Sequence, residues 1–417
     1  MLIIKGGHVI DGNVRVADVM VKDGKIAEIS ENINNPGAEI LDASGLYVAP
    51  GLVDIHVHLR EPGFEHKEDI QTGAMAAAAG GITTCCCMPN TSPVADNAAV
   101  LTYILDKAKD AAVNILPIAA VTVGQKGETL TDFAALRAAG AIALSDDGIP
   151  IQNAAVMRRA MQSAREYNML LISHCEDDEL AKNYAVNEGN VSKKLGLPGR
   201  PAIAEELMVM RDVMLAAETD ARIHIAHVST AGSVKIIRRA KSAGVKITAE
   251  TCPQYFTLTD EEILTKGTLA RVNPPLRTPH DVQAIIAGVI DGTIDAIATD
   301  HAPHAAKDKD VPLSQAQSGM VGLETSLALT LTRLYHTKTL GLGQIIQLMA
   351  ANPARILGID AGRMAVGSAA DIVIFDPDEE WTVDPAQFKS KARNTPFGGM
   401  KLHGKVKRTL VGGKVIV

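Results

Sequence analysis

The sequence contains very few aromatic side chains, which make up only 3% of its 417 residues. One Trp, six Tyr and six Phe leave the core to Ala, Val, Ile, Leu and Met, because hydrophobic residues still account for 47% of the chain. Charged residues account for 21%, as in ordinary globular proteins. A chain of this length fits one large domain with a smaller one attached.

The sequence also lacks the marks of a membrane or nucleic-acid-binding protein. Its net charge is -7, so no excess of basic residues attracts a polyanion. No stretch approaches the roughly 20 apolar residues of a membrane span, and the apolar run after Met1 is too short for a signal peptide. We therefore predict a cytoplasmic protein with a small-molecule substrate, and with neither nucleic acid nor a membrane as partner.

Cysteine is scarce as well, with five residues and no C-x-x-C pair. Cys85, Cys86 and Cys87 are adjacent, whereas Cys175 and Cys252 stand alone. Neighbouring residues of a strand point to opposite faces, so this pattern is neither a disulfide framework nor a zinc knuckle. We interpret the cysteines as reduced, small apolar residues of a core.

Both ends of the chain have the pattern of antiparallel β structure. Asp11-Gly12 and Asp23-Gly24 are hairpin-turn signals near the N-terminus, and Gly412-Gly413 is one near the C-terminus. Each end alone would form a few marginal strands with exposed edges. We therefore predict that residues 1–50 and 358–417 pair in one small β-sandwich domain.

Residues 51–357 have a different pattern, in which short apolar runs alternate with Ala-rich helical segments. This alternation is typical of βα units around a parallel sheet. Eight such units in about 300 residues predict a (β/α)₈ TIM barrel. A doubly wound open sheet is the alternative, but no G-x-G-x-x-G motif follows the first strand. The predicted strands are Leu52–His58, Ile82–Cys87, Asn114–Ala119, Ala141–Ser145, Leu170–His174, Arg222–His227, Lys246–Glu250 and Ala296–Asp300.

Catalytic groups of such a barrel lie at the carboxyl ends of its strands. The first strand ends in His56 and His58, two residues apart, so both imidazoles project from the same face. Each polar strand end alone is an ordinary cap or packed residue, but together they indicate one site. The other strand ends with ligand-type residues are Asp146-Asp147, His174, His227 and Asp300-His301.

At two strands, the alternation of side chains indicates which of two candidate residues faces the barrel axis. His224 and His227 have opposite parity, so only one can face the barrel axis. We take His227, which lies nearer the strand's end, and expect His224 to be packed or solvated on the other side. Asp147 shares parity with the small side chains of its strand, which leave room near the barrel mouth. Asp147 is therefore the expected ligand, and Asp146 the expected helper or cap.

Imidazoles and carboxylates without a thiolate suit Zn²⁺ best, with Mn²⁺ or Fe²⁺ as alternatives. Six candidate ligands exceed what one tetrahedral zinc needs, so two ions per chain are predicted, with one ion as the alternative. The predicted arrangement has His56, His58 and Asp300 on one ion, His174 and His227 on the other, and Asp147 bridging. Two ions that share a hydroxide make a strong nucleophile near neutral pH. Asp300 is the candidate general base and acid.

The motifs around these residues follow one another in the order of a known family. The motifs are Asp54-Ile-His-Val-His-Leu-Arg-Glu-Pro-Gly63, Met88-Pro-Asn-Thr91, Ser145-Asp-Asp-Gly148, Ser173-His-Cys-Glu176, Ala226-His-Val-Ser-Thr230, Asn273-Pro-Pro-Leu-Arg277 and Thr299-Asp-His-Ala-Pro-His304. With these motifs the chain resembles the amidohydrolase superfamily and, within it, the dihydroorotases of the class I bacterial type. The resemblance covers essentially the whole chain.

The resemblance implies a zinc enzyme that interconverts N-carbamoyl-L-aspartate and dihydroorotate in pyrimidine biosynthesis. By match to the motifs, Arg60, Asn90 and His304 would bind the substrate's free carboxylate, and Asn273 would contact the pyrimidine ring. A guanidinium and an amide beside the metal ligands also suit a carboxylate on chemical grounds. The alternatives are a salt bridge from Arg60 to Glu61 and a turn-forming role for Asn90.

Two features depart from the pattern of the family. Many members of the superfamily bridge their metals with a carboxylated lysine from the fourth strand, where this chain has no Lys. That absence favours Asp147 as the bridge and leaves the number of metals, one or two, open. Residues 305–320 lack an aromatic side chain expected near Pro312-Leu313, and we predict that they form a mobile loop over the site.

Two other functions compete with this interpretation. A hydantoinase- or allantoinase-like hydrolase would open another cyclic amide, but its substrates lack the carboxylate that Arg60, Asn90 and His304 would bind. A catalytically silent scaffold for aspartate transcarbamoylase would have lost metal ligands, and here all are present. We expect an active enzyme that forms a homodimer or a higher homo-oligomer, and association with aspartate transcarbamoylase is compatible with that activity.

Overall fold

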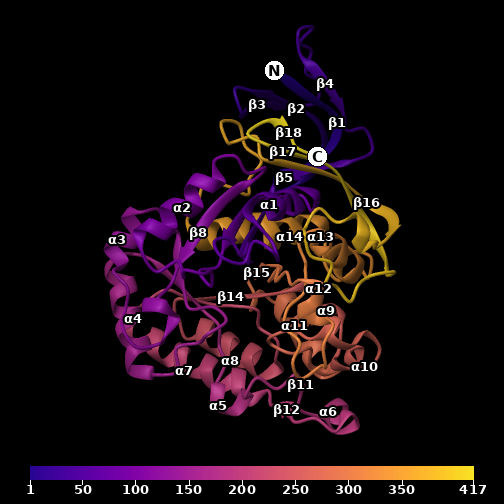
Figure 1. The fold of residues 1–417 in the computed structure, drawn as a ribbon. Helices are drawn as coiled ribbons and strands as arrows, with labels where there is room; N and C mark the ends of the chain where they lie inside the picture. Colours follow the sequence, from indigo (N-terminus) through magenta and orange to yellow (C-terminus); the bar gives the residue numbers. More distant parts are fainter.

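A ring of eight parallel strands lies at the centre of the computed structural model, which describes residues 1–417 (Figure 1). The strands are hydrogen-bonded in the order of the chain. A backbone hydrogen bond of 2.9 Å from His58 N to His301 O connects the first strand to the segment after the last. The strands are β6 (Leu52–Val57), β7 (Ile82–Cys87), β8 (Asn114–Ala119), β9 (Ala143–Ser145), β10 (Leu170–Ser173), β13 (Ile223–Ile225), β14 (Ile247–Thr251) and β15 (Ala296–Ile297).

Helices surround this ring and follow each of its strands (Figure 1). Together they confirm the predicted (β/α)₈ barrel. The α-helices are α1 (Ile70–Ala79), α2 (Ala98–Ala108), α3 (Phe133–Ala138), α4 (Ala154–Glu166), α5 (Asp178–Ala181), α6 (Asn190–Leu195), α7 (Ile203–Thr219), α8 (Ala231–Ser242), α9 (Pro253–Thr257), α10 (Ile263–Lys266), α11 (Pro279–Ile290), α12 (Ala306–Lys309), α13 (Ser326–Thr330), α14 (Leu342–Ile346) and α15 (Asn352–Leu357). Shorter elements are β11 (Val186–Asn187), β12 (Gly199–Arg200), η1 (Val123–Gln125), η2 (Asp260–Glu262), η3 (Gly267–Ala270), η4 (Leu331–Tyr335), η5 (Gln347–Ala351) and η6 (Pro385–Gln387).

Several barrel strands end earlier than their apolar runs predict. β13 stops at Ile225 and β15 at Ile297, so His227 and Asp300 lie beyond the regular strands. The backbone φ is +34° at His227 and +49° at Asp300, and such left-handed residues do not fit an extended strand. The side chains of His227 and Asp300 therefore project from irregular backbone just past the strand ends.

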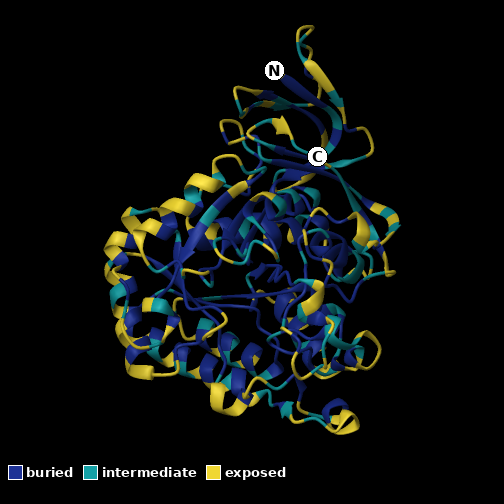
Figure 2. Ribbon diagram, viewed as in Figure 1, coloured by how far each residue is buried: buried dark blue, intermediate teal, exposed yellow.

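Buried residues fill the inside of the barrel and the layer between its strands and helices (Figure 2). A cluster that contains Val53, Ile55 and Cys86 packs with Ile356 and Leu357 of α15. The neighbours of Cys86 on β7, residues 85 and 87, belong to a different cluster, in the outer layer. All five cysteines are buried and free, as expected for small apolar core residues.

The two ends of the chain form one β-domain, as predicted (Figure 1). β5 joins them, because it pairs with β1 through Val48 and with β16 through Ala49. The strands are hydrogen-bonded into one continuous sheet, whose 14-residue core includes Ile4, Val19 and Ile372. The strands are β1 (Leu2–Ile10), β2 (Val14–Lys22), β3 (Lys25–Ser30), β4 (Glu39–Asp42), β5 (Tyr47–Pro50), β16 (Ile372–Thr382), β17 (Lys401–Val411) and β18 (Lys414–Val415).

This sheet is also attached to the barrel. The hydroxyl of Thr409 on β17 donates a hydrogen bond of 2.7 Å to the Ala78 carbonyl at the end of α1. The domain boundaries near residues 50 and 358 stay a prediction. No helix combines the length and the apolar character that crossing a membrane requires.

Candidate metal centre and active site

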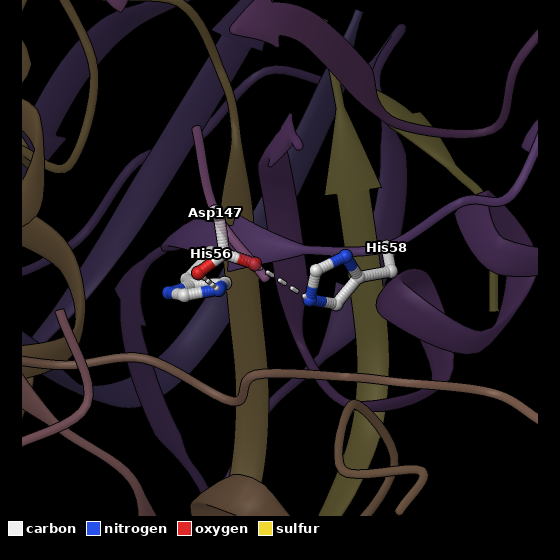
Figure 3. Close-up of side chains that lie close together, drawn as sticks. All are labelled: His56, His58 and Asp147. Carbon is white, nitrogen blue, oxygen red and sulfur yellow. Dashed lines mark ion pairs between the residues drawn. The ribbon is translucent and has the colours of Figure 1, made fainter. Parts of the chain in front are cut away.

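The two histidines of the first barrel strand face the same side, as the strand alternation predicts. His56 lies within β6 and His58 follows its last residue. Each Nε2 atom lies 3.4 Å from one carboxylate oxygen of Asp147. Figure 3 shows the ring nitrogen of His58 directed at that carboxylate. The first strand and the segment after β9 thus meet at one point.

Asp147 also contacts the second pair of histidines. Its Oδ1 lies 3.4 Å from His174 Nδ1 and 3.5 Å from His227 Nε2. These two ring nitrogens are only 2.8 Å apart. The side chains therefore form two groups, His56 with His58 and His174 with His227, and each group shares Asp147. Within each group the ligand atoms lie within 4.8 Å of one another.

Asp300 lies beside the first group. Its Oδ1 is 3.1 Å from His58 Nε2 and 3.6 Å from His56 Nε2. The backbone before it is tied to β6, because Asp54 accepts a hydrogen bond of 2.6 Å from the Thr299 hydroxyl. All six predicted metal ligands are thus brought to the same end of the barrel.

These side chains fit a divalent metal ion. His56 Nε2 and Asp147 Oδ1 are buried and make no hydrogen bond. Buried polar atoms without a partner are unfavourable, and a cation bound between them would satisfy both. Imidazole nitrogens and carboxylate oxygens without thiolates are the donors that zinc accepts. The donor set therefore supports a metal centre.

The charges of this cluster are strongly coupled. Burial works against a protonated His56, but the carboxylates of Asp147 and Glu250 outweigh it and raise the pKa of His56 well above its usual value. Burial likewise opposes an ionised Asp147, yet the positive charge on His56 and the close imidazoles of His174 and His227 hold the pKa of Asp147 well below its usual value. A metal ion bound here would compete with protons for the imidazole nitrogens.

Glu250 is a functional candidate that the strand-end reasoning missed. Its Oε1 accepts a hydrogen bond of 2.7 Å from His56 Nδ1, so Nε2 of His56 is left to face the metal centre. Its Oε2 lies 3.3 Å from Nε2 of His224. His56 and His224 together hold the pKa of Glu250 at about 2 despite its burial. Its place as the last residue of the predicted strand Lys246–Glu250 is the signal that could have revealed it.

The expectation for His224 was wrong in one respect. His224 is packed, but it lies against Glu250 inside the barrel and not on the opposite side. His227 also faces the site, although its parity differs. The parity rule fails because β13 ends at Ile225 and the positive φ of His227 turns its side chain inward. At Asp146 the expectation of a helper holds, because its carboxylate accepts backbone hydrogen bonds from Val121 and Thr122 at 2.8 and 3.1 Å.

A second missed group holds the other side of the centre. The buried Arg200 donates a hydrogen bond of 2.7 Å to Glu176 and another to the side-chain oxygen of Asn273. The amide nitrogen of Asn273 lies 3.4 Å from His174 Nε2, so Nδ1 of His174 is left to face Asp147. Glu176 stands two residues after His174, which is a spacing that could have drawn attention to it.

A cavity of about 290 Å³ opens above the metal centre. The four residues predicted to bind substrate, Arg60, Asn90, Asn273 and His304, all line it together with His58, Asp147 and Asp300. Residues 315–319 line it as well, so part of the predicted loop borders the cavity. Residues 306–309 of that segment form α12, and its mobility stays a prediction. The remaining lining residues include Asn183 and Arg271, which the sequence reasoning did not single out.

Arg60 and Asn90, two of the predicted carboxylate-binding residues, form hydrogen bonds with groups other than carboxylates. Arg60 makes no salt bridge to Glu61, and its Nε donates to the Pro303 carbonyl at 3.2 Å. Burial lowers the pKa of Arg60 to about 10, so it stays charged near neutral pH. Asn90 accepts a hydrogen bond of 2.9 Å from His58 Nδ1, which leaves its amide nitrogen free to donate. The cavity thus offers a cation and amide donors beside the metal ligands.

Comparison with known proteins agrees with this geometry. Residues 45–233 match the family model described as dihydro-orotase-like. The chain is 54% identical to the dihydroorotase of Pelotomaculum thermopropionicum, over 100% of this chain and 98% of that protein. This chain belongs to the dihydroorotase family. It is also 52% identical to the dihydroorotase of Acetivibrio thermocellus, over 100% of this chain and 99% of that one.

Solved structures of hydantoinases have the same fold as this chain. The L-hydantoinase (dihydropyrimidinase) of Arthrobacter aurescens superposes with a TM-score of 0.88 at 26% identity, covering 99% of this chain and 95% of that one. A D-hydantoinase superposes equally well, with a TM-score of 0.88 at 24% identity over 100% of this chain and 95% of that one. The second likeness concerns the fold alone.

Proposed function

We propose that this chain is a dihydroorotase of the class I bacterial type. It catalyses the reversible, zinc-dependent cyclisation of N-carbamoyl-L-aspartate to (S)-dihydroorotate plus water in pyrimidine (UMP) biosynthesis. The observation that carries the proposal is the cavity that combines the shared Asp147 centre with Arg60, Asn90 and His304. The full-length identity to curated dihydroorotases supports it.

The residues that would hold zinc are the six at the inner end of the cavity. His56, His58 and Asp300 would bind one ion, His174 and His227 the other, and Asp147 both, since it belongs to both groups. Bound zinc would polarise the reacting carbonyl and make water a stronger nucleophile near neutral pH. A single ion is the alternative, and the zinc content per chain separates the two.

Asp300 is the proposed general base and acid. During ring opening its carboxylate accepts a proton from the attacking water, and it then returns that proton to the leaving ring nitrogen. During ring closure the same steps run in reverse, and water leaves. Its distance of 3.1 Å from His58 Nε2 and its position on the cavity wall support this role.

Arg60, Asn90 and His304 would bind the carboxylate that does not react. Arg60 is half-buried, charged and without a carboxylate partner in the protein, so an anionic substrate group would neutralise it. Asn273, held by Arg200, would contact the ring. Together these contacts fix the substrate with its reacting carbonyl toward the metal ligands.

A hydantoinase-like activity is the second candidate, because solved hydantoinases share the fold. Such cyclic amides have no carboxylate for Arg60. The two functions separate when Arg60→Ala is assayed with dihydroorotate and with hydantoin. The dihydroorotase proposal expects kcat/KM to fall for dihydroorotate, and an unchanged value would contradict the role of Arg60.

The direct test is ring closure. Protein with verified zinc content is incubated with N-carbamoyl-L-aspartate at mildly acidic pH, and dihydroorotate is followed by chromatography. Asp300→Ala provides the matched inactive control. Absence of product from the zinc-loaded wild-type protein would refute the proposal, and would leave the catalytically silent scaffold as the alternative.

We also propose that the active protein is cytoplasmic and forms a homodimer or a higher homo-oligomer. Light scattering coupled to size exclusion tests the oligomer, and a monomer at micromolar concentration would contradict it. Association with aspartate transcarbamoylase is a separate hypothesis. Mixing the two purified proteins and looking for a new, larger species in the same measurement tests it.

A further inference from the structure

His304 forms part of the wall between two neighbouring cavities. It lines the active-site cavity and also a second cavity of about 400 Å³. Lys67 lines the second cavity and not the first. The ammonium of Lys67 lies 3.3 Å from His304 Nδ1. Lys67 therefore contacts His304 from the side that faces away from the substrate.

The imidazole of His304 is held on its other side as well. Its Nε2 lies 2.9 Å from the carbonyl oxygen of Ser318. A side chain at Gly319 would press against Ala302 and would come within 3.1 Å of His304 Nε2, so glycine permits this close packing. The backbone N–H of His304 donates to the Asn394 side chain at 3.0 Å. Both ring nitrogens and the backbone thus have defined partners.

These partners select one tautomer of His304. An ammonium group only donates hydrogen bonds, so the Nδ1 that faces Lys67 must carry a lone pair. A carbonyl oxygen only accepts, so the Nε2 that faces Ser318 must carry the hydrogen. Burial and the charges of Arg60, Lys309 and Lys67 hold the pKa of His304 at about 2, so the ring is neutral and carries only one hydrogen. Both contacts agree on the same form.

One nearby group argues for the opposite tautomer. The carboxylate of Asp308 lies 3.9 Å from His304 Nδ1 and would accept a hydrogen from it. Asp308 is closer to Lys67, at 3.3 Å, and it also accepts a backbone hydrogen bond from Ala305. Asp308 therefore anchors Lys67. The ammonium of Lys67 lies closer to His304 Nδ1 than Asp308 does, so this nitrogen carries the lone pair.

A carboxylate ligand needs this tautomer. Carboxylate oxygens only accept hydrogen bonds, so His304 can bind one only through an N–H that reaches the active-site cavity. We propose that Lys67 is a positioning residue that keeps the hydrogen of His304 on Nε2, ready for the substrate's carboxylate. The carboxylate then competes with the Ser318 carbonyl for that hydrogen. This inference rests on the proposed function and adds a residue that does not touch the substrate.

The tautomer itself can be measured on the zinc-loaded protein. Nitrogen NMR of histidine-labelled wild-type protein, with His304 assigned by His304→Gln, should show a protonated Nε2 and an unprotonated Nδ1 across neutral pH. In Lys67→Met, a signal for protonated Nδ1 should appear. A wild-type spectrum with Nδ1 protonated would overturn the proposal, as would a Lys67→Met spectrum identical to wild type.

Kinetics supply the second readout. Lys67→Met should raise KM for dihydroorotate about tenfold, because only part of the population then has the binding-competent tautomer. Its kcat should stay within about twofold, because Lys67 does not line the active-site cavity. Lys67→Arg should restore most of the KM, since a guanidinium also only donates. Lys307→Met removes an exposed lysine of α12 and controls for the loss of one positive charge.

The outcomes separate this inference from the proposed function. If wild-type protein does not turn over dihydroorotate, the proposed function fails, while the NMR comparison still decides the role of Lys67. If Lys67→Met lowers kcat and leaves KM unchanged, the positioning role is wrong. If Lys67→Met does not fold, the proposal is tested by the tautomer in the wild-type spectrum and by the KM of Lys67→Arg.

Discussion

The inner and outer ends of the active-site cavity are built in different ways. At the inner end, side chains contact one another: Asp147 faces four imidazoles, and Glu250 supports His56 from behind. At the outer end, cationic or neutral side chains bind backbone carbonyls, as Arg60 does with Pro303 and His304 with Ser318. The inner end therefore suits a metal cation, and the outer end suits an anion. A substrate with a reactive carbonyl at one end and a carboxylate at the other fits in one orientation.

The largest effect should come from Asp300 at the inner end. Asp300→Asn keeps the shape of the side chain but removes the proton acceptor, so kcat should fall by about a thousandfold. Zinc analysis should still find metal in the variant, because the histidines remain. Asp310→Asn, at an exposed position of the loop, serves as the control. A rate near that of the wild type would remove Asp300 from the base role.

The next largest effect should come from the outer end. Arg60→Met should lower kcat/KM for dihydroorotate about a hundredfold, because a buried charge pair with the substrate is lost. The zinc content should be unchanged, which distinguishes it from the inner-end variants. Arg393→Met removes an exposed arginine and should have no effect. If Arg60→Met lost zinc as well, the two ends would not be independent.

A smaller effect should follow from removing the support behind His56. Glu250→Gln weakens the hydrogen bond that orients the ring, so zinc affinity should fall about tenfold. Competition with a chromogenic chelator measures the affinity, and Glu380→Gln, an exposed change on β16, is the control. Equal zinc affinity in Glu250→Gln and in the wild type would show that Glu250 does not orient His56 for the metal.

The smallest effect should come from the loop at the outer end. The ammonium of Lys309 donates to the carbonyls of Thr268, Arg271 and Gln317 at 3.1, 3.1 and 2.7 Å. Lys309→Met should cost about 1 kcal/mol of local stability, which corresponds to a roughly fivefold faster proteolytic cleavage in residues 310–319. Lys307→Met should be cleaved like the wild type. Equal cleavage of Lys309→Met and wild type would show that these hydrogen bonds do not hold the loop.

The inner end of the cavity could be predicted from the sequence more fully than the outer end. The inner end could be located because strand geometry puts His56 and His58 on one face and brings the strand ends together. Both His224 and His227 face inward, although the alternation allowed only one of them to do so, since that alternation does not continue past the last residue of a strand. Glu250 is the last residue of the predicted strand Lys246–Glu250, but no pattern in the sequence shows that it supports His56 from behind.

The residues at the outer end of the cavity could not be predicted from strand geometry. Arg60, Asn90, Asn273 and His304 lie on irregular segments after the strands, where no periodicity relates one side chain to another. Their predicted role came from the resemblance to a family. The contact of Lys67 with His304 joins residues 237 positions apart in the chain, and no local pattern marks it.

The central claim is that the inner end works as a metal centre that both histidine pairs share through Asp147. The most direct measurement returns zinc stepwise to metal-stripped protein while the ring-closure rate is followed. We expect the rate to rise until two zinc ions are bound per chain, and Asp147→Ala to fail to reach that rate at any zinc concentration. Full activity without zinc, or full activity in Asp147→Ala, would contradict the account.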